Sequence, residues 1–177
     1  MRNPGRSILG TGRAVLLALM VTLAGCQAGP SPRQDAGARS FQALPAAAEQ
    51  ALTAHNSPIL YSLEPRAPRV KGDQGLLGFQ VLGKTALSDE DAEVAVKAFR
   101  SAIGDWVGGS AAACFDPRHA IRVLYGEHTY DFLLCYQCQS IWIYEDGKIL
   151  TRLGAAGSPK ELNALLTAAG VPLSTSG

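Results

Sequence analysis

The stretch of sequence that decides the fold is AIRVLYGEHTYDFLLCYQCQSIWIYEDGKILT, residues 120–151. It contains short runs rich in β-branched and aromatic residues, with turn-forming residues between them. The runs cover residues 120–125, 129–135, 139–144 and 148–151. Strands joined by short turns pair with their neighbours along the chain, so this stretch predicts an antiparallel meander of four strands.

Amphipathic helices are expected on both sides of the meander. The first begins at Ser88, where the hydroxyl and the Asp91 carboxylate can each satisfy a free backbone N–H, and it ends near Gly104. Its apolar residues recur at helical spacing: Ala92, Ala95, Val96, Phe99, Ala102 and Ile103. The second begins at Ser158, Pro159 and Glu161 and stops at Gly170. Its expected buried stripe is Leu162, Leu165, Leu166 and Ala169.

The chain before these elements predicts a further helix and further strands. Residues 45–55 are Ala-rich and expected to be helical, while residues 59–63 and 76–85 are expected to be strands with a loop at 66–74 between them. Because strands and helices do not alternate regularly, the pattern favours the α+β class. We expect a single domain over residues 44–177, a small antiparallel sheet with helices packed on one face.

The first 25 residues read as a secretory signal peptide. Basic Arg2, Arg6 and Arg13 precede an apolar run at residues 14–23, and small residues follow it. The run is about ten residues, whereas a helix that crosses a bilayer needs roughly 20. A permanent transmembrane anchor is therefore the weaker interpretation, and we expect this segment to be removed on export.

The end of this segment, Leu23-Ala24-Gly25-Cys26, resembles the lipobox of bacterial lipoproteins. The resemblance implies that Cys26 receives a diacylglyceryl group and becomes the acylated N-terminus, with fatty acyl chains such as palmitate holding it to a membrane. Residues 26–43, rich in Gly, Pro, Ser and Ala, are then expected to form a flexible linker. Gln27, where an Asp would signal inner-membrane retention, suits the outer membrane of a two-membrane host.

The charge balance excludes a nucleic-acid partner. Three of the sixteen Lys and Arg residues precede Cys26, so thirteen basic residues face fifteen acidic ones in the rest of the chain. These basic residues are scattered, whereas a phosphate-binding protein concentrates them. The expected partner is the membrane, reached through the N-terminal lipid.

Acylation of Cys26 leaves three cysteines, Cys114, Cys135 and Cys138, an odd number for an oxidising compartment. His119 supplies a fourth ligand of the kind that tetrahedral zinc takes. If residues 126–128 form a three-residue turn, His119 lies opposite Cys135 across the hairpin, and the Asp116-Pro117 turn can return Cys114 to the same place. The sequence thus predicts a structural zinc site.

Two other interpretations of the cysteines stay open. A disulfide between Cys114 and either Cys135 or Cys138 would leave a spare thiol, and would stabilise the domain by roughly 3 kcal/mol. Alternatively, Cys135 or Cys138 is a redox-active thiol whose pKa His119 lowers. Hydrolase motifs are missing from the sequence, so we assign no catalytic residue and lean against an enzyme. Arg118 and Arg122 could bind an anion or lie solvated at a strand end.

The segments Cys114-Phe115-Asp116-Pro117-Arg118-His119 and Cys135-Tyr136-Gln137-Cys138 resemble an uncharacterised family of bacterial lipoproteins and secreted proteins. Members of that family pair a CFxPRH-type segment with a downstream Cys-x-x-Cys, and the resemblance extends from about Gly78 to Leu173. Gln137 stands where relatives often carry Glu. The resemblance implies no particular activity.

Overall fold

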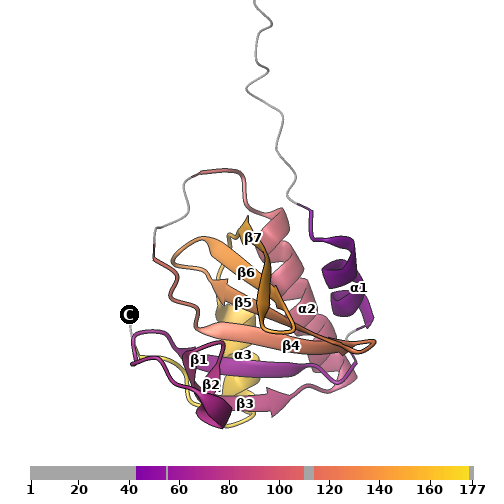
Figure 1. The fold of residues 1–177 in the computed structure, drawn as a ribbon. Coiled ribbons are helices and arrows are strands. Elements are labelled where there is room, and N and C mark those ends of the chain that lie inside the picture. Colours follow the sequence, from indigo (N-terminus) through magenta and orange to yellow (C-terminus); the bar gives the residue numbers. More distant parts are fainter. Residues whose placement is uncertain (1–42, 55, 110–113, 176–177) are drawn as a thin grey trace, which may run out of the picture. The chain divides into compact units, whose positions relative to one another are not determined.

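The computed structural model describes residues 43–54, 56–109 and 114–175 of the chain. These residues form a curled antiparallel sheet of seven strands with three helices (Figure 1). The expected α+β class is therefore confirmed. The predicted signal peptide, Cys26 and the linker up to residue 42 lie outside the described residues.

The helices and strands lie close to where the sequence predicts them. Their bounds are α1 Ala46–Ala54, β1 Ile59–Glu64, the 3₁₀ turn η1 Gly72–Gln74, β2 Gly75–Leu76, β3 Phe79–Ala86, α2 Asp89–Gly104, β4 His119–Tyr125, β5 His128–Cys135, β6 Ser140–Glu145, β7 Lys148–Gly154 and α3 Lys160–Ala168. The order across the sheet is β2-β3-β1-β4-β5-β6-β7. The predicted meander is thus β4 to β7, and β1 extends it by pairing with both β3 and β4.

The strand predicted over residues 76–85 is two strands rather than one. Leu77 (φ 52°) and Gly78 (φ 88°) both have positive φ, and they form a two-residue turn that pairs Leu76 with Phe79. Two-residue hairpin turns commonly require positive φ at their central positions. A leucine at such a position is not a turn signal in the sequence, which is why the hairpin was not expected.

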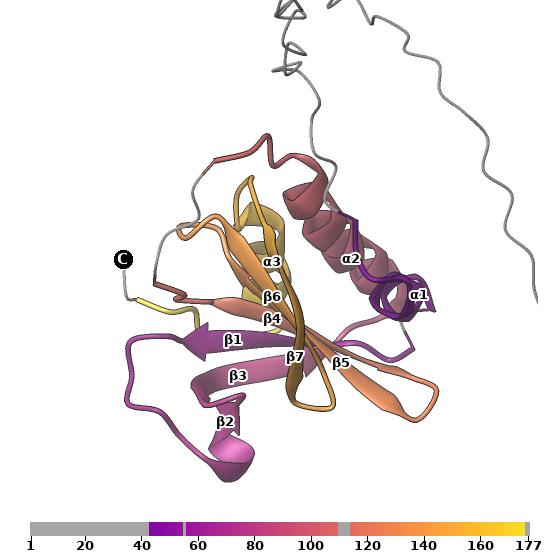
Figure 2. The same ribbon diagram turned by 45° about the horizontal axis from the view of Figure 1, so that its top comes forward.

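One face of the sheet, the helix face, is covered by the three helices (Figure 2). Ile121, Phe132 and Ile143 belong to this face and are fully buried. Every predicted apolar residue of α2 is buried, and Ser88 caps that helix by accepting a hydrogen bond from the Asp91 backbone N–H. Leu162 and Leu166 of α3 are buried as expected. Ala169 is exposed, because α3 ends one residue before it.

The second face of the sheet has an aromatic core of its own. Phe115, from the segment before β4, stacks flat on Trp142 of β6 with ring centroids 4.0 Å apart. It also meets Phe79 of β3 edge to face at 6.2 Å. This cluster includes Leu133, Cys135 and Cys138, so the predicted cysteine site lies on the face away from the helices.

A buried ion pair also lies on the second face. Asp131 is only 1% exposed, and its carboxylate accepts hydrogen bonds from Arg122 Nε at 2.6 Å and Arg122 Nη2 at 2.8 Å. The two residues are directly opposed on β4 and β5. The hydrogen bonds that Arg122 donates to Asp131 are the main reason that the pKa of Arg122 is raised.

Replacement of Arg122 is expected to destabilise the domain strongly. Arg122→Ala leaves the Asp131 carboxylate buried without its partner, which costs about 3 kcal/mol of unfolding free energy. Arg152→Ala is the matched control, because Arg152 is exposed and only covers the Trp142 ring at 4.3 Å; it should cost less than about 1 kcal/mol. Urea denaturation measures both. Equal losses of unfolding free energy in the two variants would show that the buried ion pair contributes no more to stability than the exposed contact.

Candidate functional site

The cysteine site is a disulfide that closes the turn between β5 and β6. Cys135, the last residue of β5, is bonded to Cys138, and their Cα atoms are 5.2 Å apart. The turn is tight, since the Gln139 N–H donates to the Tyr136 carbonyl at 3.1 Å. The Cys138 N–H also donates to Cys135 Sγ at 3.0 Å. Both cysteines are buried, with 2% and 4% of their surface exposed.

This pairing differs from the disulfide that the sequence suggested. A bridge from Cys114 to Cys135 or Cys138 is wrong for this form of the chain, because Cys114 is free and exposed. The reason is local: a Cys-x-x-Cys turn between adjacent strands already holds its two cysteines within bridging distance. Among the described residues there is one disulfide and one free thiol, as that interpretation expected, but the bonded pair is Cys135 and Cys138.

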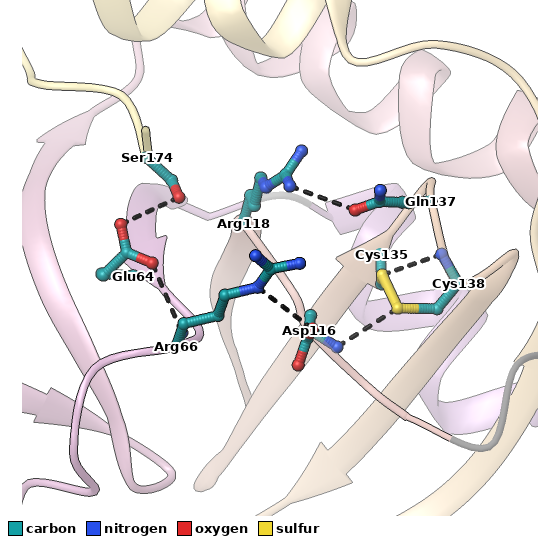
Figure 3. Close-up of polar contacts among 8 residues, drawn as sticks. All are labelled: Glu64, Arg66, Asp116, Arg118, Cys135, Gln137, Cys138 and Ser174. Atoms are coloured by element: carbon teal, nitrogen blue, oxygen red, sulfur yellow. Dashed lines mark hydrogen bonds and ion pairs between the residues drawn. A yellow bond between two sulfur atoms is a disulfide. The ribbon is translucent and has the colours of Figure 1, made fainter. Parts of the chain in front are cut away.

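The segment Phe115 to Arg118 lies against this turn (Figure 3). The Asp116 N–H donates to Cys138 Sγ at 3.2 Å, and Arg118 Nη2 donates to Gln137 Oε1 at 3.1 Å. Arg66 Nε forms an ion pair with the Asp116 carboxylate at 3.9 Å. The Asp116-Pro117 turn was expected to return Cys114 to this site; it is the backbone N–H of Asp116 that contacts the Cys-x-x-Cys turn, while Cys114 is exposed and unbonded.

His119 does not join the cysteines, because the predicted register of the hairpin is wrong by one residue. The β4–β5 turn contains two residues, Gly126 and Glu127, so Tyr125 pairs with His128 and His119 pairs with Leu134. A shift of one residue moves a side chain to the other face of the sheet. His119 consequently points to the helix face, while Cys135 packs on the second face.

The environment of His119 makes it a neutral structural residue. It is 4% exposed, and its Nε2 donates to Asn163 Oδ1 of α3 at 2.7 Å. Burial lowers the pKa of His119 to about 4, against the opposing effect of that hydrogen bond. Cys135 and Cys138 are bonded to each other and carry no thiolate in this form, so the lowering of a cysteine pKa by His119 stays a prediction for the reduced chain.

Asn163 is the partner of His119 that sequence reasoning missed. It follows the buried Leu162 on α3 and is itself half-buried. A polar residue beside an apolar stripe is ordinary in an amphipathic helix. The sequence therefore carries no signal that this amide meets a histidine from a distant strand.

The predicted zinc ligands do not fit a metal ion in this form. Two of the four, Cys135 and Cys138, are bonded to each other, and thiolates rather than disulfides ligate zinc. No group of three or more His, Cys, Asp or Glu side chains could hold a metal in the part of the chain that the structure describes. Zinc binding by Cys114, His119, Cys135 and Cys138 stays a prediction for the reduced chain.

The hollow beside the disulfide is too small for a substrate. Its volume is about 30 Å³, and its lining includes Asp116, His119, Cys135 and Tyr136. A small-molecule site usually has several hundred Å³, whereas a hollow of this size holds only one or two waters. Among the described residues, this hollow beside Cys135 therefore has no room for a substrate.

The two arginines considered for anion binding both have protein partners. Arg122 is held by Asp131 and Arg118 donates to Gln137. Binding of an anion would have to compete with these contacts, and it stays a prediction.

Comparison of the chain with known protein families, with curated proteins and with solved structures finds no match. Among the described helices, none is both long enough and apolar enough to cross a membrane.

The buried neutral His119 predicts a pH dependence of stability. The unfolded chain takes up a proton near pH 6.5 and the folded chain only near pH 4, where the pKa of His119 lies. Over this window the unfolded state binds more protons, so stability falls with falling pH, by about 3 kcal/mol in total from this residue. Below pH 4 its contribution no longer changes.

Urea denaturation of the wild type and of His119→Gln at pH 7 and pH 4 measures this contribution. It is the difference between the two proteins in how far the unfolding free energy falls from pH 7 to pH 4. His128→Gln is the control, because His128 is exposed and its hydrogen bond with Asp146 raises its pKa, which gives the opposite direction. An unchanged slope in His119→Gln would show that His119 is not buried neutral.

Proposed function

We propose that the chain is a bacterial lipoprotein that presents a disulfide-stapled α+β domain in the cell envelope. Cys26 carries the lipid, and residues 26–43, with their linker-like composition, connect it to the domain. The observation that supports the proposal most is the Cys135–Cys138 disulfide, since disulfides persist in compartments outside the reducing cytosol. The lipobox-like residues 23–26 support attachment to a membrane.

The position of the disulfide supports a structural role. It links the end of β5 to the turn before β6, in the same buried cluster as Phe115, and both sulfurs accept hydrogen bonds from backbone N–H groups. Buried disulfides of this kind are inert toward external thiols unless the structure opens. The domain is then a binding or structural module of the envelope. With Gln27 after the lipidated cysteine, the outer membrane is the favoured location in a two-membrane host.

Zinc binding is proposed only for the reduced chain, where Cys114, Cys135 and Cys138 would all be thiols. Because His119 lies on the helix face, such a site would require a change in the end of the β4–β5 hairpin. Zinc titration of the reduced chain with and without His119→Ala tests this; a bound equivalent lost in the variant supports the site, and no binding contradicts it.

The lipid anchor is tested on the protein extracted from its native membrane. The mature chain should begin at residue 26, and its intact mass should exceed that of residues 26–177 by two or three acyl groups. Cys26→Ser should remain uncleaved and lack these groups, whereas Cys114→Ser should be processed normally. An unmodified Cys26 in the wild type would overturn the proposal.

The structural role of the Cys135–Cys138 disulfide is tested by measuring its contribution to stability. Removal of the bridge in Cys135→Ser/Cys138→Ser should lower the unfolding free energy by about 2 kcal/mol, the chain-entropy contribution expected for a loop of four residues. Cys114→Ser should change it by less than about 0.5 kcal/mol, since Cys114 is exposed. Equal stability of all three proteins would contradict a stapling role.

A further inference from the structure

The cysteines differ sharply in their access to solvent. Cys114 is exposed and free, while Cys135 and Cys138 are 2% and 4% exposed. Thiol–disulfide exchange requires the attacking thiolate to reach a sulfur of the bond. An external thiol can therefore meet Cys114 directly, but it cannot reach the disulfide without an opening of the domain.

The segment that contains Cys114 is hydrogen-bonded to one sulfur of the bridge. The Asp116 N–H donates to Cys138 Sγ at 3.2 Å, and Cys114 is only two residues away, about 7 Å of chain at full extension. Phe115 between them is stacked flat against Trp142, so the residue next to Cys114 is held in place. This hydrogen bond is to Cys138; the other sulfur, of Cys135, accepts a hydrogen bond from the Cys138 N–H.

We propose that Cys114 is the nucleophile of an internal thiol–disulfide relay through which the buried bridge oxidises an external dithiol. In the first step the Cys114 thiolate attacks Cys138 Sγ. A Cys114–Cys138 bond forms, the Cys135–Cys138 bond breaks, and Cys135 leaves as a thiolate that takes up a proton. The Cys138 N–H, which already donates to Cys135 Sγ at 3.0 Å, stabilises the charge on this leaving group.

The second step takes place at the surface. A thiolate of the external dithiol attacks the exposed sulfur of Cys114, which forms a mixed disulfide and releases Cys138 as a thiol. The second thiol of the substrate then displaces Cys114. In this turnover the substrate dithiol loses two electrons and two protons and becomes a disulfide, and the protein ends with three thiols. The relay uses the disulfide of the proposed module and does not depend on its lipid anchor.

The relay predicts that Cys114 bonds to Cys138 more readily than to Cys135, which two variants that each lack one cysteine of the bridge can test. The full chain is used with Cys26→Ser, so that neither lipid nor a fourth thiol contributes. Trypsin places Cys114 on peptide 101–118 and both other cysteines on peptide 123–148. With oxidised glutathione, Cys135→Ser should link these peptides at least tenfold faster than Cys138→Ser. Equal rates in the two variants, or no link in Cys135→Ser, would overturn the proposal.

A second measurement keeps the bridge intact. Dithiothreitol, as the dithiol probe, should reduce Cys135–Cys138 at least tenfold more slowly in Cys114→Ser than in the parent chain, as followed by alkylation and mass spectrometry. Urea denaturation should give the same unfolding free energy for both proteins. A slower reduction in Cys114→Ser could then not be caused by a more stable fold. Identical rates would mean that the probe reaches the bridge without Cys114, and the relay would be wrong. Because Cys26 is replaced throughout, these outcomes are independent of whether the lipid anchor is confirmed.

Discussion

Gly126 and Glu127 join β4 to β5 in a turn of two residues, with Gly126 in the positive-φ conformation (61°) that such turns need. Side chains alternate between faces along each strand, so the length of this turn determines which residues of β4 and β5 share a face. It directs Ile121 and Phe132 toward the helices, and Arg122 and Asp131 toward the second face. A turn longer by one residue would instead place Leu133 on the face of Ile121 and Phe132 on the face of Arg122.

The same register separates the residues that looked like one site. His119 turns toward α3 and is satisfied there by Asn163, while Cys135 turns toward Phe115 and Trp142. The sheet thus has two different environments at the end of one hairpin. On the helix face a buried imidazole is kept neutral by loss of solvent. On the second face, the disulfide and the Phe115–Trp142 stack belong to one buried cluster that packs against the strands.

None of the three described helices packs on the second face, where side chains from other segments form the core. Phe115 reaches it from the segment before β4, and Phe79 reaches it from β3. The Cys135–Cys138 bridge and the Arg122–Asp131 pair add covalent and electrostatic links between neighbouring strands or their ends. The contacts of Asp116 and Arg118 with the Cys-x-x-Cys turn bring the segment that begins with Cys114 into this core.

The sequence by itself determined the elements apart from the β2–β3 hairpin, the α+β class and the buried residues of α2, because hydrophobic period and helix caps are encoded within a few neighbouring residues. Only the tertiary structure decided the register of β4 on β5, the face of His119 and its meeting with Asn163, and which two of three cysteines are bonded. Each of these depends on a single turn residue or on a contact between distant segments, and composition and spacing along the chain do not carry that information.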